Sequence, residues 1–212
     1  MIRLFADELA CVRGGREIFQ GLGFAVISGE TLAITGPNGA GKSSLLRLIA
    51  GLIRPARGRI VLEGGDADLS IGEQSHYLGH LDALKVSLTV VENLAFWSDF
   101  LGGGKEISAV LRQVGLEGLS HLPVGYLSAG QRRRLGLARL LATERPIWLL
   151  DEPSASLDTA GQELLAQMMK SHAAHGGIIA VATHGPVGSG AVKELRLGAR
   201  HVLRAAPQAE LR

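Results

Sequence analysis

The chain has 212 residues, of which 46% are hydrophobic and 20% charged, and its formal net charge is +2. This composition excludes a disordered chain, and the length suits one domain, because single cores stop growing efficiently only at about 250 residues. The balanced charge gives no reason to expect nucleic acid as the main partner. A lone cysteine, Cys11, cannot form an internal disulfide, which is typical of a reducing compartment.

The chain starts with a segment that contains Asp7 and Glu8, where a secretory signal would need its apolar run, so we expect no export. No stretch of about 18 uncharged apolar residues occurs, so we also expect no direct membrane span. A role in transport would therefore require a separate membrane partner.

Residues 1–30 alternate short apolar runs with turn formers at Gly14–Gly15 and Ser28–Glu30, which predicts short strands. Together with part of residues 56–75, they are expected to form a small antiparallel β lobe.

The apolar run Thr31–Thr35 predicts a buried strand that leads into a glycine-rich loop. Residues 43–50 then show helical spacing that ends at Gly51. The order strand, loop, helix favours an α/β fold.

Residues 82–127 are mostly helical in pattern, with helices predicted near 89–97 and 107–114. Phe96 and Trp97 are predicted to belong to the core of this helical insertion rather than to a ligand site.

Two further apolar runs, 147–150 and 178–182, predict buried strands, with a helical stretch near 160–172 between them. Alternating strands and helices predict a parallel sheet with helices on its faces. We therefore expect an α/β fold over residues 1–212 as one domain, with a frayed tail after Val202.

A phosphate-binding loop follows the strand that ends at Thr35. Its glycines allow backbone N–H groups to turn toward phosphates, and the next helix adds about half a unit of positive charge at its N-terminus. Lys42 is expected to reach the β- and γ-phosphates of ATP, and Ser43 to ligate Mg²⁺. The residues predicted to bind the nucleotide here are Gly36, Pro37, Asn38, Gly39, Ala40, Gly41, Lys42, Ser43 and Ser44.

Two adjacent carboxylates, Asp151 and Glu152, end the apolar run that starts at Ile147. The carboxyl ends of parallel strands are the edge at which α/β proteins bind ligands. Asp151 is therefore expected to hold Mg²⁺, directly or through water, and Glu152 to act as general base for the attacking water. An isolated acidic pair would be a solvated turn, but the strand before it and the loop upstream favour a site.

The segment Leu127–Gln131 reads Leu-Ser-Ala-Gly-Gln and lies upstream of the acidic strand end. Taken alone, Ser128 before a predicted helix is a good N-cap, and that alternative stays open. With the other motifs, the segment resembles the signature motif of the nucleotide-binding subunits of ATP-binding-cassette (ABC) transporters, with Ala129 in place of a glycine.

The resemblance covers nearly the whole chain and implies a P-loop NTPase with a RecA-like core. It also implies a homodimer that sandwiches two ATP molecules, in which Ser128 and Gly130 bind the γ-phosphate held by the other protomer and Gln131 belongs to the same ATP-binding set. Residues 156–158 resemble the loop that meets that protomer. His184, after the strand that ends at Ala182, resembles the family's switch histidine and is implied to be catalytic.

Two positions depart from the family's pattern. The aromatic residue that stacks on adenine is missing near position 13, so stacking would be weaker or supplied by the planar guanidinium of Arg13. His80 occupies the position of the glutamine that senses Mg²⁺ and water, which makes His80 the candidate for that catalytic role.

Both departures, with the segments 77–97 and 127–153, resemble one subfamily: the ATP-binding subunit of the bacterial cytochrome c maturation system, often labelled a heme exporter. The resemblance implies a peripheral ATPase on the cytoplasmic face of the inner membrane, bound to integral permease subunits. Its ATP hydrolysis would drive export of heme or release of a heme-loaded carrier.

Two other functions would leave different marks in the sequence. An ABC transporter subunit with another cargo would be expected to show the aromatic residue and the glutamine that this chain lacks. A soluble cassette protein for translation or DNA repair would need two cassettes or a long coiled-coil insertion.

Two sequence features receive structural interpretations. His76 and His80 are not interpreted as heme ligands, because of their glycine and loop context. Arg132–Arg134 is interpreted as a solvated face or an inter-lobe contact rather than a nucleic-acid or membrane patch.

Overall fold

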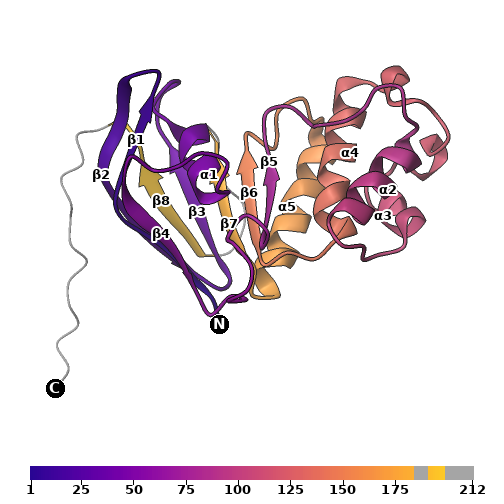
Figure 1. Ribbon diagram of the computed structural model, residues 1–212. Helices are drawn as coiled ribbons and strands as arrows, with labels where there is room; N and C mark the ends of the chain where they lie inside the picture. Colours follow the sequence, from indigo (N-terminus) through magenta and orange to yellow (C-terminus); the bar gives the residue numbers. More distant parts are fainter. Residues whose placement is uncertain (184–190, 199–212) are drawn as a thin grey trace.

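An antiparallel sheet in the order β2-β1-β4 forms one layer of the molecule, on the left in Figure 1. The computed structural model describes residues 1–183 and 191–198. β1 and β2 join at Gly14 and Gly15, whose φ values of +55° and +76° suit a two-residue hairpin turn. The strands of this sheet are β1 (Arg3–Arg13), β2 (Arg16–Ile27) and β4 (Arg57–Glu63).

The expectation of short strands in this lobe is wrong, since β1 has 11 residues and β2 has 12. Irregularities in their register, the first between Ala6 and Leu9, bend the pair and allow long strands to follow the core.

A second, parallel sheet carries the strands in the order β5-β6-β7-β3-β8. Every residue of β6 and β7 is buried, as expected for inner parallel strands covered on both faces. The shared direction places the ends of β3 and β6 at one edge of the sheet. The strands are β3 (Glu30–Thr35), β5 (Ser75–Leu78), β6 (Ile147–Asp151), β7 (Ile178–Ala182) and β8 (Ala191–Arg196).

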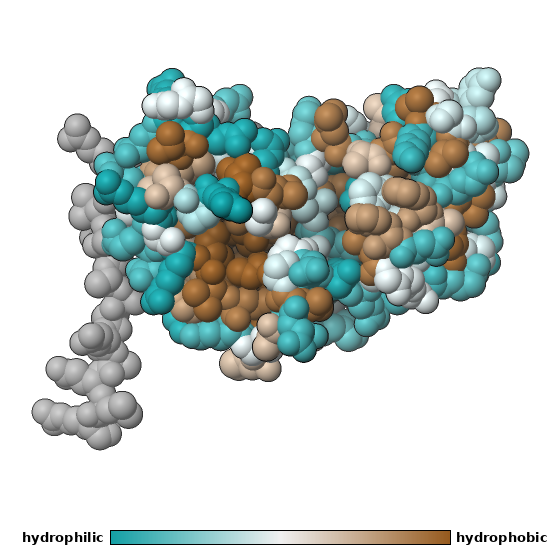
Figure 2. All heavy atoms as spheres, in the orientation of Figure 1, coloured by the Kyte–Doolittle hydropathy of each residue, from teal (hydrophilic) through white to brown (hydrophobic). Residues whose placement is uncertain are grey.

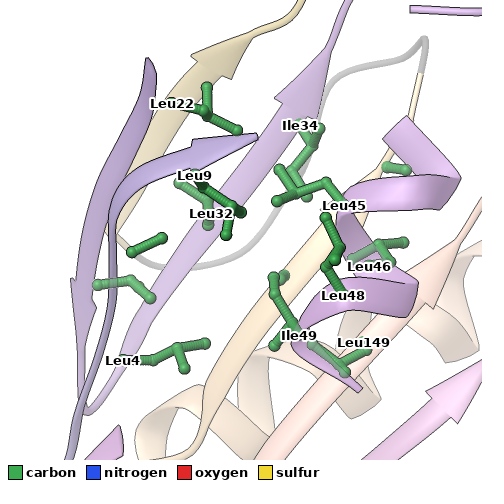
Figure 3. Packing of buried hydrophobic residues seen from close by; sticks show 14 of the residues in the cluster. Leu4, Leu9, Leu22, Leu32, Ile34, Leu45, Leu46, Leu48, Ile49 and Leu149 are labelled. Carbon is green, nitrogen blue, oxygen red and sulfur yellow. The ribbon is translucent and has the colours of Figure 1, made fainter. Parts of the chain in front are cut away.

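Helices cover the two faces of this sheet. On one face, α1 (Lys42–Ile49) packs Leu45 and Ile49 into a cluster with Ile34 and Leu149, which Figure 3 shows from close by.

On the opposite face, α5 (Thr159–Ala174) packs Met168 against Trp148 and Ile179. The ring of Trp148 stacks on His172 of α5, with the ring centroids 4.0 Å apart. Alternate residues of β6 thus enter different cores, which fixes the register of the strand.

The segment between β5 and β6 is helical and lies on the right in Figure 1. Its own core includes Leu94 of α2 and Leu111 of α3. The last helix, α4, joins the two lobes, because Leu135 belongs to this core while Leu137 packs with β6. The elements are α2 (Val90–Phe100), α3 (Ile107–Gln113), η1 (Glu117–Leu119), η2 (Val124–Tyr126) and α4 (Ala129–Ala142).

Phe96 does not lie in the core of the helical insertion, contrary to the sequence-based expectation, since 42% of it is exposed. The buried side of α2 is formed by Val90, Asn93, Leu94 and Ser98, so Phe96 faces outward; Trp97 is partly buried. Figure 2 shows apolar residues gathered over this part of the molecule.

The elements confirm the predicted α/β fold with its antiparallel β lobe and inserted helices. β8 was not predicted, because it is an edge strand whose residues are almost all exposed and so lack an apolar pattern. Within residues 1–183 and 191–198, none of the helices combines the length and apolar character that crossing a bilayer would require.

Candidate functional site

The loop between β3 and α1 depends on glycine. Gly39 (φ +81°) and Gly41 (φ +100°) have left-handed backbone conformations that other residues rarely adopt. A Cβ on Gly41 would also lie 2.5 Å from Cγ2 of Ile18, so the packing admits no side chain there. Gly41 is the N-cap of α1 and supplies no side-chain cap, which leaves the start of the helix suited to an anion.

Lys42 lies inside this loop, with only 8% of its surface exposed. Its Nζ donates hydrogen bonds to the carbonyl oxygens of Gly36 at 2.8 Å and Pro37 at 3.3 Å. The ammonium is thus held among the backbone groups of the loop, where a phosphate would meet both the positive charge and the amides.

A cavity of about 340 Å³ opens beside the loop, a size that suits a small ligand. The hairpin β1-β2, the loop with the start of α1, and the end of β6 all contribute to it. Its lining residues are Arg13, Ile18, Asn38, Gly39, Gly41, Lys42, Ser43, Ser44, Asp151 and Glu152. The structure therefore brings together the predicted phosphate-binding loop and the predicted acidic pair. Gly36, Pro37 and Ala40 belong to the loop but do not line the cavity.

The acidic pair lies at the carboxyl end of β6. Asp151 is the last residue of the strand and is 3% exposed, whereas Glu152 is half-buried. Glu152 has a φ of +47°, a conformation that costs a non-glycine residue about 1–3 kcal/mol. Its N–H donates to the carbonyl of Ala182 at 2.9 Å, so β7 helps to hold this turn in place.

Gly36 is held by a contact that the sequence did not reveal. Its φ is +136°, and a Cβ would overlap the carbonyl oxygen of Leu197. Leu197 follows β8 and donates its N–H to Thr35 at 2.8 Å. The end of β8 thus supports the start of the phosphate-binding loop. The sequence did not predict this contact, because the exposed residues of β8 show no strand pattern.

The signature segment lies at the start of α4 and does not line the cavity. Ser128 Oγ accepts from the N–H of Gln131 at 3.2 Å, and the side chain of Gln131 accepts from the N–H of Ser128 at 2.8 Å. The N-cap alternative is therefore borne out as a structural role. Gly130 lies against the turn 154–158, where a Cβ would approach the carbonyl of Ser156 to 3.1 Å.

Three histidines named in the sequence analysis have different surroundings. His80 is exposed and does not line the cavity. His76 is buried, and its Nε2 lies 2.7 Å from the carbonyl oxygen of Thr143. His184 lies outside the described residues.

Burial shifts the pKa values of several groups, among them His76 and Cys11. It lowers the pKa of His76 to about 4, so this imidazole is neutral at physiological pH and Nε2–H donates to Thr143. Burial also raises the pKa of the Cys11 thiol, which keeps it in the unreactive protonated form.

A larger cavity of about 720 Å³ lies at the opposite end of β6, between α4 and α5. Trp148, Met168 and His172 are among its lining residues. No residue predicted for nucleotide or metal binding contributes to it, so the smaller cavity is the candidate site.

A family model described as "ABC transporter" matches residues 19–155. The chain is 62% identical over 198 residues to the "Cytochrome c biogenesis ATP-binding export protein CcmA" of Nitrobacter winogradskyi, covering 93% of this chain and 98% of the relative. A protein of Rhodopseudomonas palustris (strain BisB5) with the same description is 59% identical over 192 residues, covering 90% and 96%.

Solved structures show the same fold. A putative ABC transporter ATP-binding protein from Pyrococcus furiosus matches with a TM-score of 0.78 at 20% identity, covering 92% of this chain and 97% of that chain. A bacterial Atm1-family ABC exporter with ATP bound matches with a TM-score of 0.77 at 26% identity, covering 92% of this chain and 37% of that one. The likeness to the Pyrococcus furiosus protein shows the fold alone.

Proposed function

This chain belongs to the ABC transporter ATP-binding family, and from that membership we propose that it is the ATP-hydrolysing subunit of an exporter that serves cytochrome c biogenesis. The observation that carries the proposal is the cavity in which the phosphate-binding loop faces the acidic pair. The relatives named for cytochrome c biogenesis, similar over nearly the whole chain, support the exporter's role. The proposal takes residues 1–212 as one ABC-type ATP-binding domain.

As a member of this family the chain binds ATP. We assign the phosphates to the loop from Gly36 to Ser44, with Lys42 neutralising the β- and γ-phosphates. The buried ammonium among backbone carbonyls supports that assignment, since phosphate oxygens would offer it stronger acceptors than the carbonyls it now contacts.

The residues at the cavity fit Mg²⁺. Ser43 contributes a hydroxyl and Asp151 a buried carboxylate, and hard oxygen donors of this kind are the ligands that Mg²⁺ prefers. The bound ion would neutralise charge on the phosphates during transfer.

Glu152 is proposed as the general base that polarises the attacking water, because its carboxylate lines the same cavity one residue beyond Asp151. His80 and His184 remain proposed catalytic residues on the strength of the family resemblance.

The signature residues Ser128, Gly130 and Gln131 are proposed to contact ATP held by a second copy of the chain. Their absence from the cavity of their own chain supports a role across an interface. The homodimer would bind integral permease subunits at the cytoplasmic face of the inner membrane and couple hydrolysis to heme export or to release of a heme-loaded carrier.

Complementation tests this function. A host that makes cytochrome c and lacks its own copy is supplied with either the parent or the Lys42→Ala variant, and its proteins are stained for covalent heme. We expect heme staining with the parent alone. A well-expressed parent that restores none would favour the second candidate, an ABC transporter subunit with another cargo, and would leave ATP binding unaffected.

A further inference from the structure

Arg133 is almost fully buried on α4, with 3% of its side chain exposed. A guanidinium has five N–H donors, and each of them has an acceptor here. Nη1 donates to Gly79 O at 3.1 Å and to Asp82 Oδ1 at 2.7 Å. Nη2 donates to Asp151 O at 3.2 Å and to Glu152 O at 2.8 Å, and Nε donates to Pro153 O at 3.1 Å.

These acceptors belong to two separate segments. One is the loop 79–82, which contains His80; the other is the turn 151–153, which contains the proposed base. Of the triplet 132–134, Arg133 is the inter-lobe contact, whereas Arg134 pairs with the exposed Asp158 at 2.6 Å. A buried cation with one carboxylate partner is tolerated only when its remaining donors are satisfied, so the five bonds hold both segments to one geometry.

Further contacts hold the loop 79–82 and the residue that follows it. Arg139 donates to Asp82 O at 3.1 Å and lies over the ring of Trp97, 3.6 Å from its centroid. Trp97 Nε1 donates in turn to Ala83 O at 3.1 Å. Asp82 lies close to α4 at Gly136, where a Cβ would lie 3.0 Å from Asp82 Oδ1, so a larger residue there would push this carboxylate outward.

The backbone of Glu152 needs such support, because its positive φ is unfavourable for a residue with a side chain. Its N–H is held by Ala182, as described above, and its carbonyl by Arg133 and by the N–H of Ala155 at 3.1 Å. Removing Arg133 would take away the donor that lies 2.8 Å from this carbonyl oxygen, and the side chain of Glu152 could then leave the direction in which it now projects.

We propose that Arg133 is a positioning residue for ATP hydrolysis: it fixes the backbone of Glu152 and the loop that carries His80 in one arrangement, without touching the nucleotide. The inference rests on the proposed role of Glu152. It predicts that Arg133 affects the hydrolytic step rather than ATP binding, since Arg133 is absent from the lining of the cavity.

The test uses the full-length purified chain with Mg²⁺ and ATP. Arg133→Met, close in volume but without donors, should keep an ATP Kd within about twofold of the parent while kcat falls about 10- to 100-fold, as expected for a misplaced catalytic group. Arg133→Lys keeps the positive charge but loses the forked donors of the guanidinium. Its kcat should therefore lie between those of the parent and of Arg133→Met. Asp82→Asn keeps an acceptor oxygen for Arg133, so its kcat should fall much less than that of Arg133→Met.

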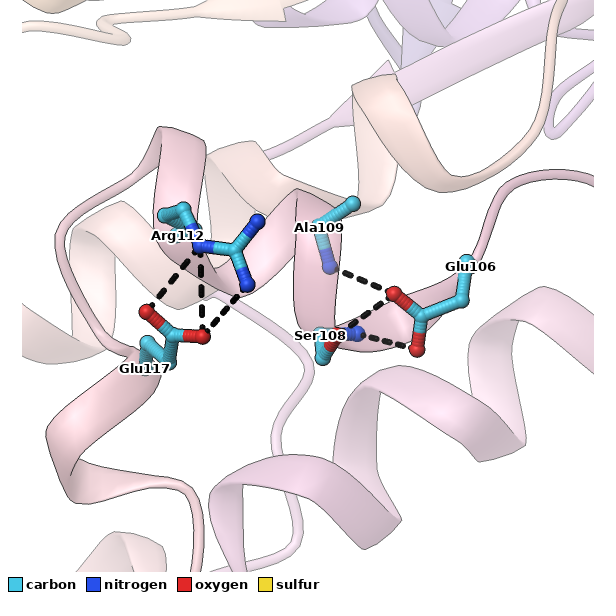
Figure 4. Close-up of polar contacts among 5 residues, drawn as sticks. All are labelled: Glu106, Ser108, Ala109, Arg112 and Glu117. Carbon is cyan, nitrogen blue, oxygen red and sulfur yellow. Dashed lines mark hydrogen bonds and ion pairs between the residues drawn. The ribbon is translucent and has the colours of Figure 1, made fainter.

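Arg112→Met is the matched control. Arg112 also makes a forked pair with a carboxylate, that of Glu117 at 2.7 Å, but on the exposed surface of the helical insertion (Figure 4). This control should keep the parent kcat. Rates are divided by the number of ATP-binding sites titrated in each preparation, so that unfolded protein does not count.

A folded Arg133→Met variant with the parent kcat would overturn the inference, as would a loss confined to ATP affinity. Where Arg133→Met does not fold, Arg133→Lys decides by the same rule. Glu152→Gln is measured alongside: hydrolysis by that variant at the parent rate would overturn the proposed base and this inference with it. If Glu152→Gln is inactive while both Arg133 variants match the parent, the inference alone fails.

Discussion

Arg13 lines the cavity that we propose for the nucleotide. The family resemblance implies an aromatic ring near this position that stacks on adenine, and the guanidinium of Arg13 would take its place. A planar guanidinium over a base is worth about 0.5–1 kcal/mol at an exposed site. Arg13→Ala should therefore raise the Kd for ATP about two- to fivefold, measured by titration with a fluorescent ATP analogue.

Arg16 provides the control, because it lies opposite Arg13 in the register of the hairpin but does not line the cavity. Arg16→Ala should leave the affinity unchanged. Equal losses for the two variants would mean that general positive charge attracts the nucleotide and that Arg13 does not stack.

His76 makes stability depend on pH. Its pKa is lowered by burial to about 4 in the folded protein, against about 6.5 when unfolded. Between pH 6.5 and pH 4, His76 binds a proton in the unfolded chain but not in the folded chain. The free energy of unfolding therefore falls as the pH falls. The loss approaches about 1.4 kcal/mol per pH unit for this residue down to pH 4, and above pH 6.5 its stabilisation is complete.

Urea unfolding of the parent and of His76→Gln between pH 7 and pH 4.5 measures this. The amide retains a donor for Thr143 and does not titrate, so the variant's stability should fall less steeply below pH 6.5. Parallel curves would show that His76 is not the group responsible.

At this scale the sequence predicted the parts of the site that are contiguous and flanked by regular structure, namely the loop around Lys42 and the pair Asp151 and Glu152. It did not predict the contact of Gly36 with Leu197 or the bonds of Arg133. These contacts join segments that are far apart in the chain. The sequence around Gly36 or Arg133 contains no local pattern that indicates which distant residue each of them contacts.

At the scale of whole elements, α2 and α4 start with the same capping arrangement. Thr89 with Glu92 caps α2, and Ser128 with Gln131 caps α4. Thr89→Ala and Ser128→Ala should each lower the unfolding free energy by about 1 kcal/mol, measured by urea unfolding.

The two variants should differ in ATP hydrolysis. A hydrogen bond to a charged group contributes about 1.5–3 kcal/mol, so Ser128→Ala should lose about tenfold or more of its activity if Ser128 contacts the partner's nucleotide. Thr89→Ala, with the same loss of a cap, should keep the parent rate. Equal rates for both variants would leave Ser128 with its capping role alone.

The inner strands β3, β6 and β7 and the helices α1 and α5 were predicted within a few residues. Burial on both faces gives a strand a continuous apolar run, and burial on one face gives a helix a clear period. β7 was predicted at 178–182 and observed as Ile178–Ala182. α5 extends the predicted helix to Thr159–Ala174. The edge strand β8 and the full length of β1 and β2 escaped prediction, since exposed edges and register shifts leave no regular alternation.

For the whole molecule, the nucleotide cavity and the signature segment occupy separate places on one chain, which makes the site as proposed depend on a second copy. Glu152→Gln with ATP and Mg²⁺ should therefore run as a dimer in light scattering, about twice the monomer mass of 22.3 kDa, because ATP binds and is not hydrolysed. The same variant with ADP should remain a monomer.

Lys42→Ala, which should lose tight ATP binding, is the control and should remain a monomer with either nucleotide. A monomeric Glu152→Gln at saturating ATP would show that the chain alone does not form the sandwich. The order of the motifs alone does not predict the proposed dimer. It shows which segments occur in the chain, but not whether a segment contacts ATP bound to its own copy or to the other copy.

The chain has two tryptophans, and the fold places Trp148 in the parallel sheet and Trp97 in the helical insertion. Trp148 lies in the parallel sheet against His172, whereas Trp97 donates a hydrogen bond to Ala83, directly after the loop 79–82, and lies under Arg139. Intrinsic fluorescence therefore contains two separable optical signals: with Trp97→Phe the emission follows the sheet, and with Trp148→Phe it follows the loop. No added dye is needed to watch the two lobes respond to a nucleotide at different moments.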